Sequence, residues 1–165
     1  MAEASAMKAR LARLQAELTQ DCATIAQLAQ QIATQARPAS SDEAALALLA
    51  LRVHRYYTAF ESALERIERT FDASPTGPDW HTALLEGAAL ELVGVRPRVL
   101  PPGVARLHLR EVLKFRHFFR QAYAVELDAT KLAVVADHVV AACTEVDEAL
   151  REFLGLVASL AHQLG

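Results

Sequence analysis

Apolar residues recur at steps of three and four along two long stretches, one near each end of the chain, and this spacing restricts the fold more than any other feature of the sequence. The first stretch contains Leu11, Leu14, Leu18, Cys22, Ile25, Leu28 and Ile32. The second contains Leu132, Val135, Val139, Cys143, Val146, Leu150, Phe153, Val157 and Leu160. Such steps place side chains on one face of an α-helix. We therefore expect two long amphipathic helices, over about residues 2–36 and about residues 128–163.

Three shorter helices are expected between these two. The segment Ser41–Glu43 supplies an N-cap for the second helix, and the last helix is expected to open near Asp128. Prolines and glycines indicate loops at residues 72–79 and 93–103. The shorter helices are expected from the cap at residues 41–43 to about Phe71, from about Trp80 to Leu92, and over about residues 103–124. The sequence thus predicts an all-α, up-and-down bundle of about five helices in a single domain of residues 1–165.

Charge and hydropathy narrow the range of functions. The formal net charge is -3, so the chain as a whole is not a general binder of polyanions, and any contact with RNA must come from a local basic patch. No apolar run is long enough for a signal peptide or a membrane span. We therefore expect a cytoplasmic protein that has no membrane partner.

The chain lacks the residue patterns of metal, redox and phosphate-loop sites. Cys22 and Cys143 are isolated within apolar helical patterns, and we expect both to be small core residues. The sequence contains no Glu-x-x-His pair and no phosphate-binding loop that ends in Gly-Lys. The expectation is a protein without a metal and without a cofactor.

The strongest local signal is the stretch Lys114–Tyr123, which reads KFRHFFRQAY and interleaves four basic or potentially basic side chains with four aromatic ones. On a helix, Arg116, Arg120 and Tyr123 lie along one stripe. Two neighbouring guanidinium groups require an anion, and a phosphate is a natural candidate. The spacing also allows ion pairs on the bundle surface with Glu111, Glu126 or Asp128. The aromatic side chains expected to anchor the stretch in the core are Phe115, Phe118 and Phe119.

This stretch resembles the Arg-x4-His-x-Tyr motif of the HepT-like ribonuclease toxins of the HEPN superfamily, with Arg116, Gln121 and Tyr123 at the three motif positions. Further segments resemble landmarks of that family in family order, and the resemblance covers about residues 10–160. These segments are residues 52–67, 77–81, 93–97 and 123–128. The chain departs from the family at Gln121, where the family has histidine. Deliberate replacement of a parental histidine and natural decay both explain the glutamine.

The resemblance implies the toxin of a type VII toxin–antitoxin system, a metal-independent endoribonuclease that acts on an RNA such as tRNA or mRNA and not on DNA. In that family the motif histidine moves protons as the 2′-hydroxyl attacks the phosphate, a role that would fall to position 121, and Arg116 would stabilise the developing charge. Lys114, His117 and Arg120 would contact the RNA. Because glutamine does not titrate near neutral pH, Gln121 predicts an inactive ribonuclease scaffold. His117 lies one helical turn earlier, which is too far to replace a placed general base.

The resemblance also implies two partners. One is an MntA-like nucleotidyltransferase antitoxin, which would transfer AMP from ATP to Tyr123. The other is a second copy of the chain, because Arg116 and position 121 differ by about 140° in direction on an ideal helix. Either the helix unwinds there or a second subunit completes the site. Since the family forms two-fold dimers, we expect a homodimer.

The alternative is a non-enzymatic helical interaction module, a degenerate HEPN protein that binds a protein partner or a nucleotide. It is favoured if Arg116 is held in an intrachain ion pair on an outer face, away from any second copy. The remaining histidines are interpreted as ordinary surface or bundle-edge residues, namely His54, His81, His108, His138 and His162.

Overall fold

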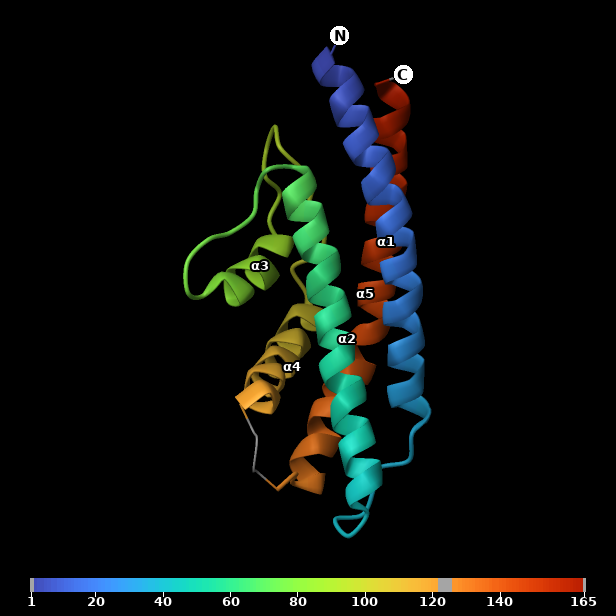
Figure 1. Cartoon of the computed structure of the whole chain (residues 1–165), viewed down its shortest axis with the longest axis vertical. Coiled ribbons are helices and arrows are strands. Elements are labelled where there is room, and N and C mark those ends of the chain that lie inside the picture. The colour runs from blue at the N-terminus through green and yellow to red at the C-terminus, as the bar shows by residue number, and fades with distance from the viewer. Residues whose placement is uncertain (1, 122–125, 165) are drawn as a thin grey trace.

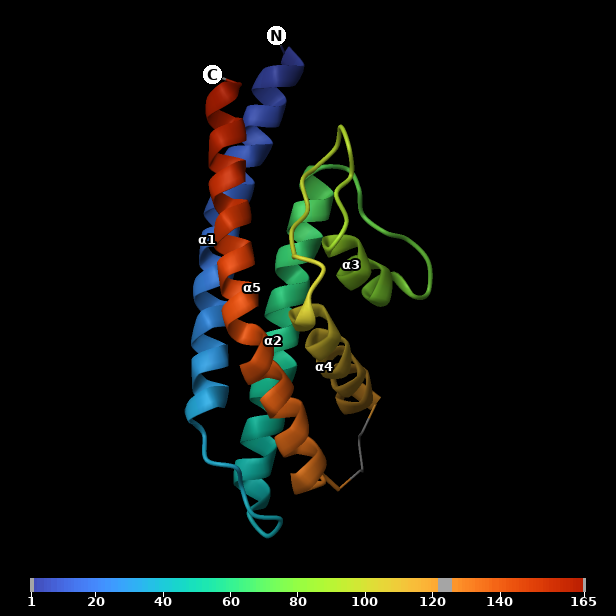
Figure 2. The same cartoon turned by 180° about the vertical axis from the view of Figure 1, so that it is seen from behind.

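The computed structural model describes residues 2–121 and 126–164, and these residues form five α-helices (Figure 1). The helices are α1 (Ala2–Thr34), α2 (Glu43–Thr70), α3 (Trp80–Ala88), α4 (Val104–Gln121) and α5 (Ala129–Gln163). α1, α2 and α5 run alongside one another as the three long helices, and the shorter α3 and α4 pack against the α2 side of the molecule (Figure 2). The predicted all-α bundle is confirmed. Among the described helices, none combines the length and the apolar character that a membrane crossing requires.

The helix ends follow local capping rules. The Asp42 side chain accepts a hydrogen bond of 3.0 Å from the backbone N–H of Ala45, so the predicted N-cap is present. Asp128 caps α5 in the same way by accepting from the N–H of Lys131 at 3.0 Å. The third helix ends earlier than expected, because the chain turns at residues 92–96, where the N–H of Leu92 donates to the carbonyl of Arg96 at 3.0 Å. The fourth is described as far as Gln121, and residues 122–125 lie outside the described part of the chain.

The core is organised around α2, which contacts each of the other helices. Its inner face carries three of the largest fully buried side chains, those of Tyr56, Tyr57 and Phe60. All seven apolar residues of the expected N-terminal stripe are buried, which confirms that helical face. Of the C-terminal stripe, Val135, Cys143 and Leu160 are only partly buried. The two cysteines are free thiols, and Cys22 is buried as expected.

A buried ion pair ties the α3–α4 connection to α2. Arg96 is 3% exposed and Glu68 on α2 is 4% exposed, and the guanidinium bonds the carboxylate through both Nε and Nη2. The same guanidinium donates to the backbone carbonyls of Gly87, Leu90 and Pro97 at 3.0–3.1 Å. The loop that leads into α4 is therefore fixed against α2 at Glu68, and this contact positions the beginning of α4.

We expect Arg96→Met to lower the free energy of unfolding by about 3–5 kcal/mol, because it leaves the Glu68 carboxylate buried without its counter-ion. Chemical denaturation followed by circular dichroism measures this loss. Arg98→Met is the matched control, because Arg98 is exposed and has no ion pair within the described residues, and its effect is expected to stay within about 0.5 kcal/mol. Equal effects of the two substitutions would contradict the assigned role of Arg96.

Candidate functional site

Arg116 points into the interior between α4 and α2. The residue is 7% exposed, and its Nη2 lies 2.8 Å from Oε1 of Glu61, which is itself 3% exposed. Its Nε donates to Oγ1 of Thr58 at 3.4 Å. Arg116 therefore pairs with a buried carboxylate and not with the surface carboxylates that its spacing allowed, which are Glu111, Glu126 and Asp128. Arg116 does form an intrachain ion pair, but on the inner side of α4 and not on an outer face.

Glu61 connects Arg116 to a histidine on a third helix. Its Oε2 lies 2.7 Å from Nδ1 of His81, near the beginning of α3. The His81 ring stacks on Trp80 with a centroid separation of 3.7 Å and meets the ring of His117 edge-on at 5.2 Å. We call Arg116, Glu61, His81 and His117 the arginine cluster. It joins α2, α3 and α4 and contains one guanidinium, one carboxylate and two imidazoles.

Positive charge dominates the surroundings of the cluster. Burial lowers the pKa of His117 below its usual value, and the neighbouring His81 and Arg116 lower it further, while Glu61 acts in the opposite direction. On α2, burial together with Arg116 and Arg120 lowers the pKa of His54. Neutral imidazoles are therefore favoured here at neutral pH, which is the form that accepts a proton.

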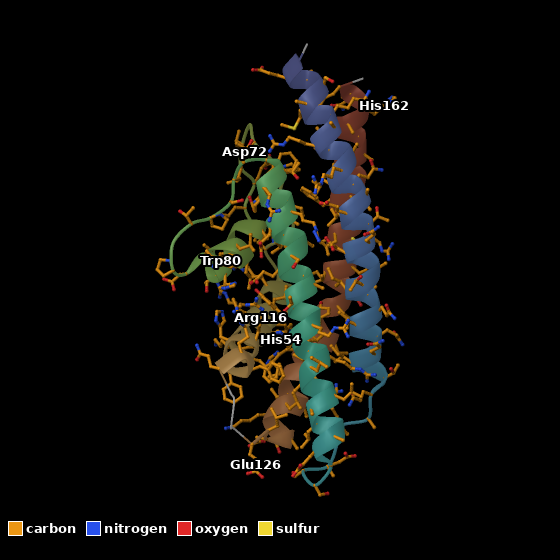
Figure 3. The ribbon with its side chains drawn as sticks, in the orientation of Figure 1. His54, Asp72, Trp80, Arg116, Glu126 and His162 are labelled. Atoms are coloured by element: carbon orange, nitrogen blue, oxygen red, sulfur yellow. The ribbon has the colours of Figure 1, made fainter. Side chains whose placement is uncertain are left out.

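Two buried polar atoms in this region have no hydrogen-bond partner among the described residues. They are Nη1 of Arg116 and Nδ1 of His54. Figure 3 shows both residues on the side of the molecule that also carries Trp80. Buried polar atoms are nearly always paired in folded proteins, so an unpaired guanidinium nitrogen indicates a place for an acceptor from outside the described residues. An oxyanion fits this requirement best.

The other predicted site residues lie on the solvent side of α4. Lys114 is exposed and pairs with Glu111 at 2.7 Å, and His117, Arg120 and Gln121 are also exposed. Tyr123 lies outside the described residues. Phe118 was expected in the core but is 45% exposed, whereas Phe115 is buried and Phe119 is half-buried. The helix can turn only one side to α2 and α5, so the third aromatic ring is left at the surface.

Arg116 and Gln121 do not converge within one chain. The arginine is buried against Glu61, while the glutamine is exposed in the last described turn of the same helix. α4 is helical throughout Val104–Gln121, so the helix does not unwind between the two positions. Arg116 and position 121 were expected to meet either through an unwound helix or through a second subunit. The continuous helix excludes the first arrangement and leaves the second.

Sequence reasoning missed Glu61 and His81. A signal for the glutamate was present, because Glu61 and Glu68 are spaced seven residues apart among the apolar residues of the buried face of α2. Carboxylates in such positions need counter-ions from elsewhere in the chain. His81 carried no comparable signal, since its partner is 20 residues away on another helix.

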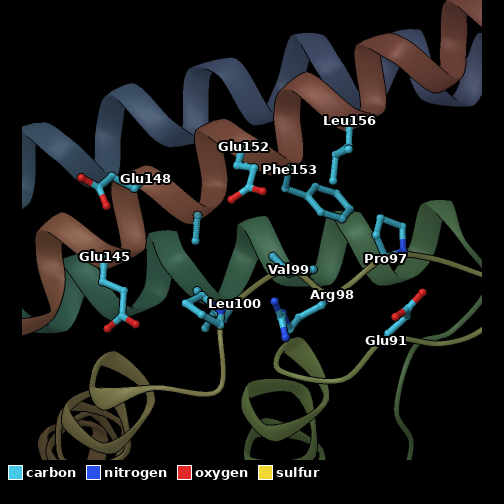
Figure 4. Close-up of a pocket in the computed structure, with 12 residues that line it drawn as sticks. Glu91, Pro97, Arg98, Val99, Leu100, Glu145, Glu148, Glu152, Phe153 and Leu156 are labelled. Carbon is cyan, nitrogen blue, oxygen red and sulfur yellow. The ribbon is translucent and has the colours of Figure 1, made fainter.

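A cavity elsewhere in the molecule is less suited to a phosphate. A cavity of about 380 Å³ lies between α5 and residues 97–101, and Figure 4 shows that Glu145, Glu148 and Glu152 of α5 line it, with Arg98 on the opposite wall. Three carboxylates disfavour an anionic ligand. In the described part of the chain, no group of three or more metal-binding side chains is suitably arranged to hold a metal ion.

The sequence model of a family described as HepT-like protein matches residues 47–157. This range contains most of α2, all of α3 and α4 and most of α5, and therefore the whole arginine cluster. Searches of the curated proteins and of the solved structures found no match.

We expect Arg120→Gln to raise the pKa values of both His54 and His117, since the Arg120 charge contributes to lowering each of them. Titration of the ring proton resonances by NMR measures the two shifts. Arg151→Gln removes an exposed arginine from α5 and is expected to leave both titrations unchanged. Unchanged pKa values in the Arg120 variant would show that its charge does not reach the cluster.

Proposed function

Because the chain belongs to the HepT-like family of the HEPN superfamily, we propose that it is the RNA-cleaving toxin of a type VII toxin–antitoxin system, in a form whose motif histidine is replaced by Gln121. The observation that carries the proposal is the Arg116 side chain. Two of its nitrogens are held by Glu61 and Thr58, and the third, Nη1, is buried and has no partner among residues 2–121 and 126–164. An arginine fixed in this way is ready to bind one phosphate oxygen without further reorganisation.

In the proposed reaction, the RNA 2′-hydroxyl attacks the adjacent phosphorus and the bond to the 5′-oxygen breaks. One group takes the proton of the 2′-hydroxyl, and another gives a proton to the leaving 5′-oxygen. Arg116 stabilises the charge on the phosphoryl oxygens, and Lys114, His117 and Arg120 bind the RNA backbone. The products are a 2′,3′-cyclic phosphate and a 5′-hydroxyl. None of these steps calls for a metal or a cofactor, and the substrate is an RNA such as tRNA or mRNA.

Gln121 cannot take part in these proton transfers, because an amide neither gains nor loses a proton near neutral pH. Proton transfer by a placed side chain is typically worth about 10²–10⁴-fold in rate. The chain is therefore proposed to bind RNA but to cleave it at least about a hundred times more slowly than the same chain with histidine at this position.

The active unit is proposed to be a homodimer. The exposed face of α4 carries Val104, Leu107 and Phe118, which are 61%, 54% and 45% exposed. On a helix these residues lie within about 60° of one another, and Gln121 borders the same face. The Lys114–Glu111 ion pair lies on this face between the apolar side chains. Because exposed apolar side chains are suited to contact with a second chain, a two-fold axis beside them would bring position 121 of one copy toward the other.

Control of the toxin is proposed to act through Tyr123, two residues after the last described residue of α4. The partner would be an MntA-like nucleotidyltransferase that transfers AMP to the tyrosine hydroxyl. The added phosphate would compete with RNA for Arg116 and Arg120.

A second candidate is the non-enzymatic interaction module, in which the basic residues of α4 bind a protein partner or a nucleotide. The Arg116–Glu61 pair favours it, because a carboxylate at 2.8 Å already balances the arginine charge. The two proposed functions predict different results for Gln121→His. The toxin is expected to gain RNA cleavage, and the interaction module is not.

We expect Gln121→His to increase RNA cleavage by at least about 10²-fold in the presence of EDTA, because it restores a group that titrates near neutral pH. The assay is the cleavage of a labelled RNA, with the products analysed for cyclic phosphate ends. Gln163→His, at the exposed end of α5, is the matched control and is expected to change nothing. If the folded Gln121→His protein gains no activity, the interaction module is the better explanation.

We expect the chain to sediment as a dimer at micromolar concentration, and Phe118→Glu to weaken the dimer by at least about tenfold, because the substitution introduces a charge on the apolar face of α4. Analytical ultracentrifugation measures the dissociation constant. Leu156→Glu, at a residue 41% exposed on α5, is expected to leave the dimer intact. A monomeric chain, or equal effects of the two substitutions, would exclude the α4 interface.

A further inference from the structure

Two histidines lie together beside Arg116, although the motif position itself carries glutamine. The rings of His81 and His117 are 5.2 Å apart and nearly perpendicular. We propose that His81 and His117 form a second acid–base pair, which cleaves RNA slowly in the chain with Gln121. This inference rests on the function proposed above, and it identifies the residues that supply proton transfer at the same phosphate site.

His81 is oriented as a proton-transfer group. Its Nδ1 lies 2.7 Å from the Glu61 carboxylate, which accepts the Nδ1 hydrogen and so leaves Nε2 as the atom that exchanges protons. The Trp80 ring stacked at 3.7 Å fixes the plane of the imidazole. The side chain is 14% exposed, so it is largely fixed by its neighbours. An imidazole held by a carboxylate in this manner is the usual arrangement of a catalytic histidine.

His117 complements His81. It is exposed on α4 and is adjacent in sequence to the arginine proposed to bind the phosphate. The charged groups that act on it are His81, Arg116 and Arg120, which lower its pKa, and Glu61, which raises it, and burial adds to the lowering. The neutral form of its imidazole, which accepts a proton, is therefore favoured at neutral pH. His117 is too far along α4 to act in the place of the motif histidine, and we assign it as the base of a separate pair in which His81 is the acid.

These two residues account for both proton transfers of the reaction. His117 accepts the proton of the 2′-hydroxyl as the new O–P bond forms. The P–O5′ bond breaks, and the protonated His81 delivers a proton from Nε2 to the 5′-oxygen. The Glu61 carboxylate lies where it balances the positive charge of the protonated His81 ring. Exchange with water then returns both imidazoles to their starting states.

The test compares RNA cleavage by the full-length chain and by its His81→Asn and His117→Asn variants, with EDTA present and over a range of pH. We expect the unsubstituted chain to cleave RNA above the protein-free blank, about 10²–10⁴-fold more slowly than Gln121→His. Each asparagine variant is expected to cleave RNA at least about tenfold more slowly than the unsubstituted chain. Its plot of cleavage rate against pH is expected to lose one of the two sloping limbs. His162→Asn, at the far end of α5, is the control and should leave both unchanged.

Asparagine at position 81 can still donate a hydrogen bond to Glu61 from the place of Nδ1, so the variant preserves the contact that organises the cluster. Thermal unfolding checks that the fold is retained. Cleavage by Gln121→His without cleavage by the unsubstituted chain would overturn the histidine pair and leave the proposed function intact. Residual cleavage that is as fast in both asparagine variants as in the unsubstituted chain would also overturn it. If neither the unsubstituted chain nor Gln121→His cleaves RNA, the proposed function fails as well.

Discussion

Two carboxylates on the buried face of α2 determine where much of the remaining chain must lie. An ionised carboxylate away from water is strongly unfavourable unless a counter-ion and hydrogen bonds compensate it. Arg96 of the α3–α4 connection is the counter-ion of Glu68. Glu61 pairs with Arg116 of α4 and with His81 of α3. The same requirement therefore orders the second half of the fold and assembles the candidate site.

This arrangement has a consequence for the chemistry of Arg116. Its charge is balanced by Glu61 within the chain, so an RNA phosphate does not gain the full attraction of a free guanidinium. In return the side chain is already fixed, with Nη1 left for an incoming oxygen. A fixed donor loses little side-chain entropy when its ligand binds, and this favours the stabilisation of a transition state over tight binding of the substrate.

The helices could be predicted from the sequence, because their causes are local. Steps of three and four defined the buried stripe of α1, and Asp42 and Asp128 marked two helix starts through side chains only three residues from their targets. The pairing of Glu61 with His81 and Arg116 could not be predicted in this way, because those contacts cross between helices. Phe118 shows the same limit, since aromatic content does not reveal which side of α4 faces the core.

The candidate site lies on both sides of α4, and each side offers different residues for proton transfer. Position 121 lies on the exposed side of a continuous helix, whereas the arginine is buried, so in the proposed reaction position 121 would act on the bound phosphate only through a second copy. His81 approaches from α3 and is joined to the arginine through Glu61, so it needs no second copy. In the proposed reaction, glutamine at position 121 would therefore disable only the route that depends on a dimer, whereas the proposed route within one chain would retain every residue that it requires.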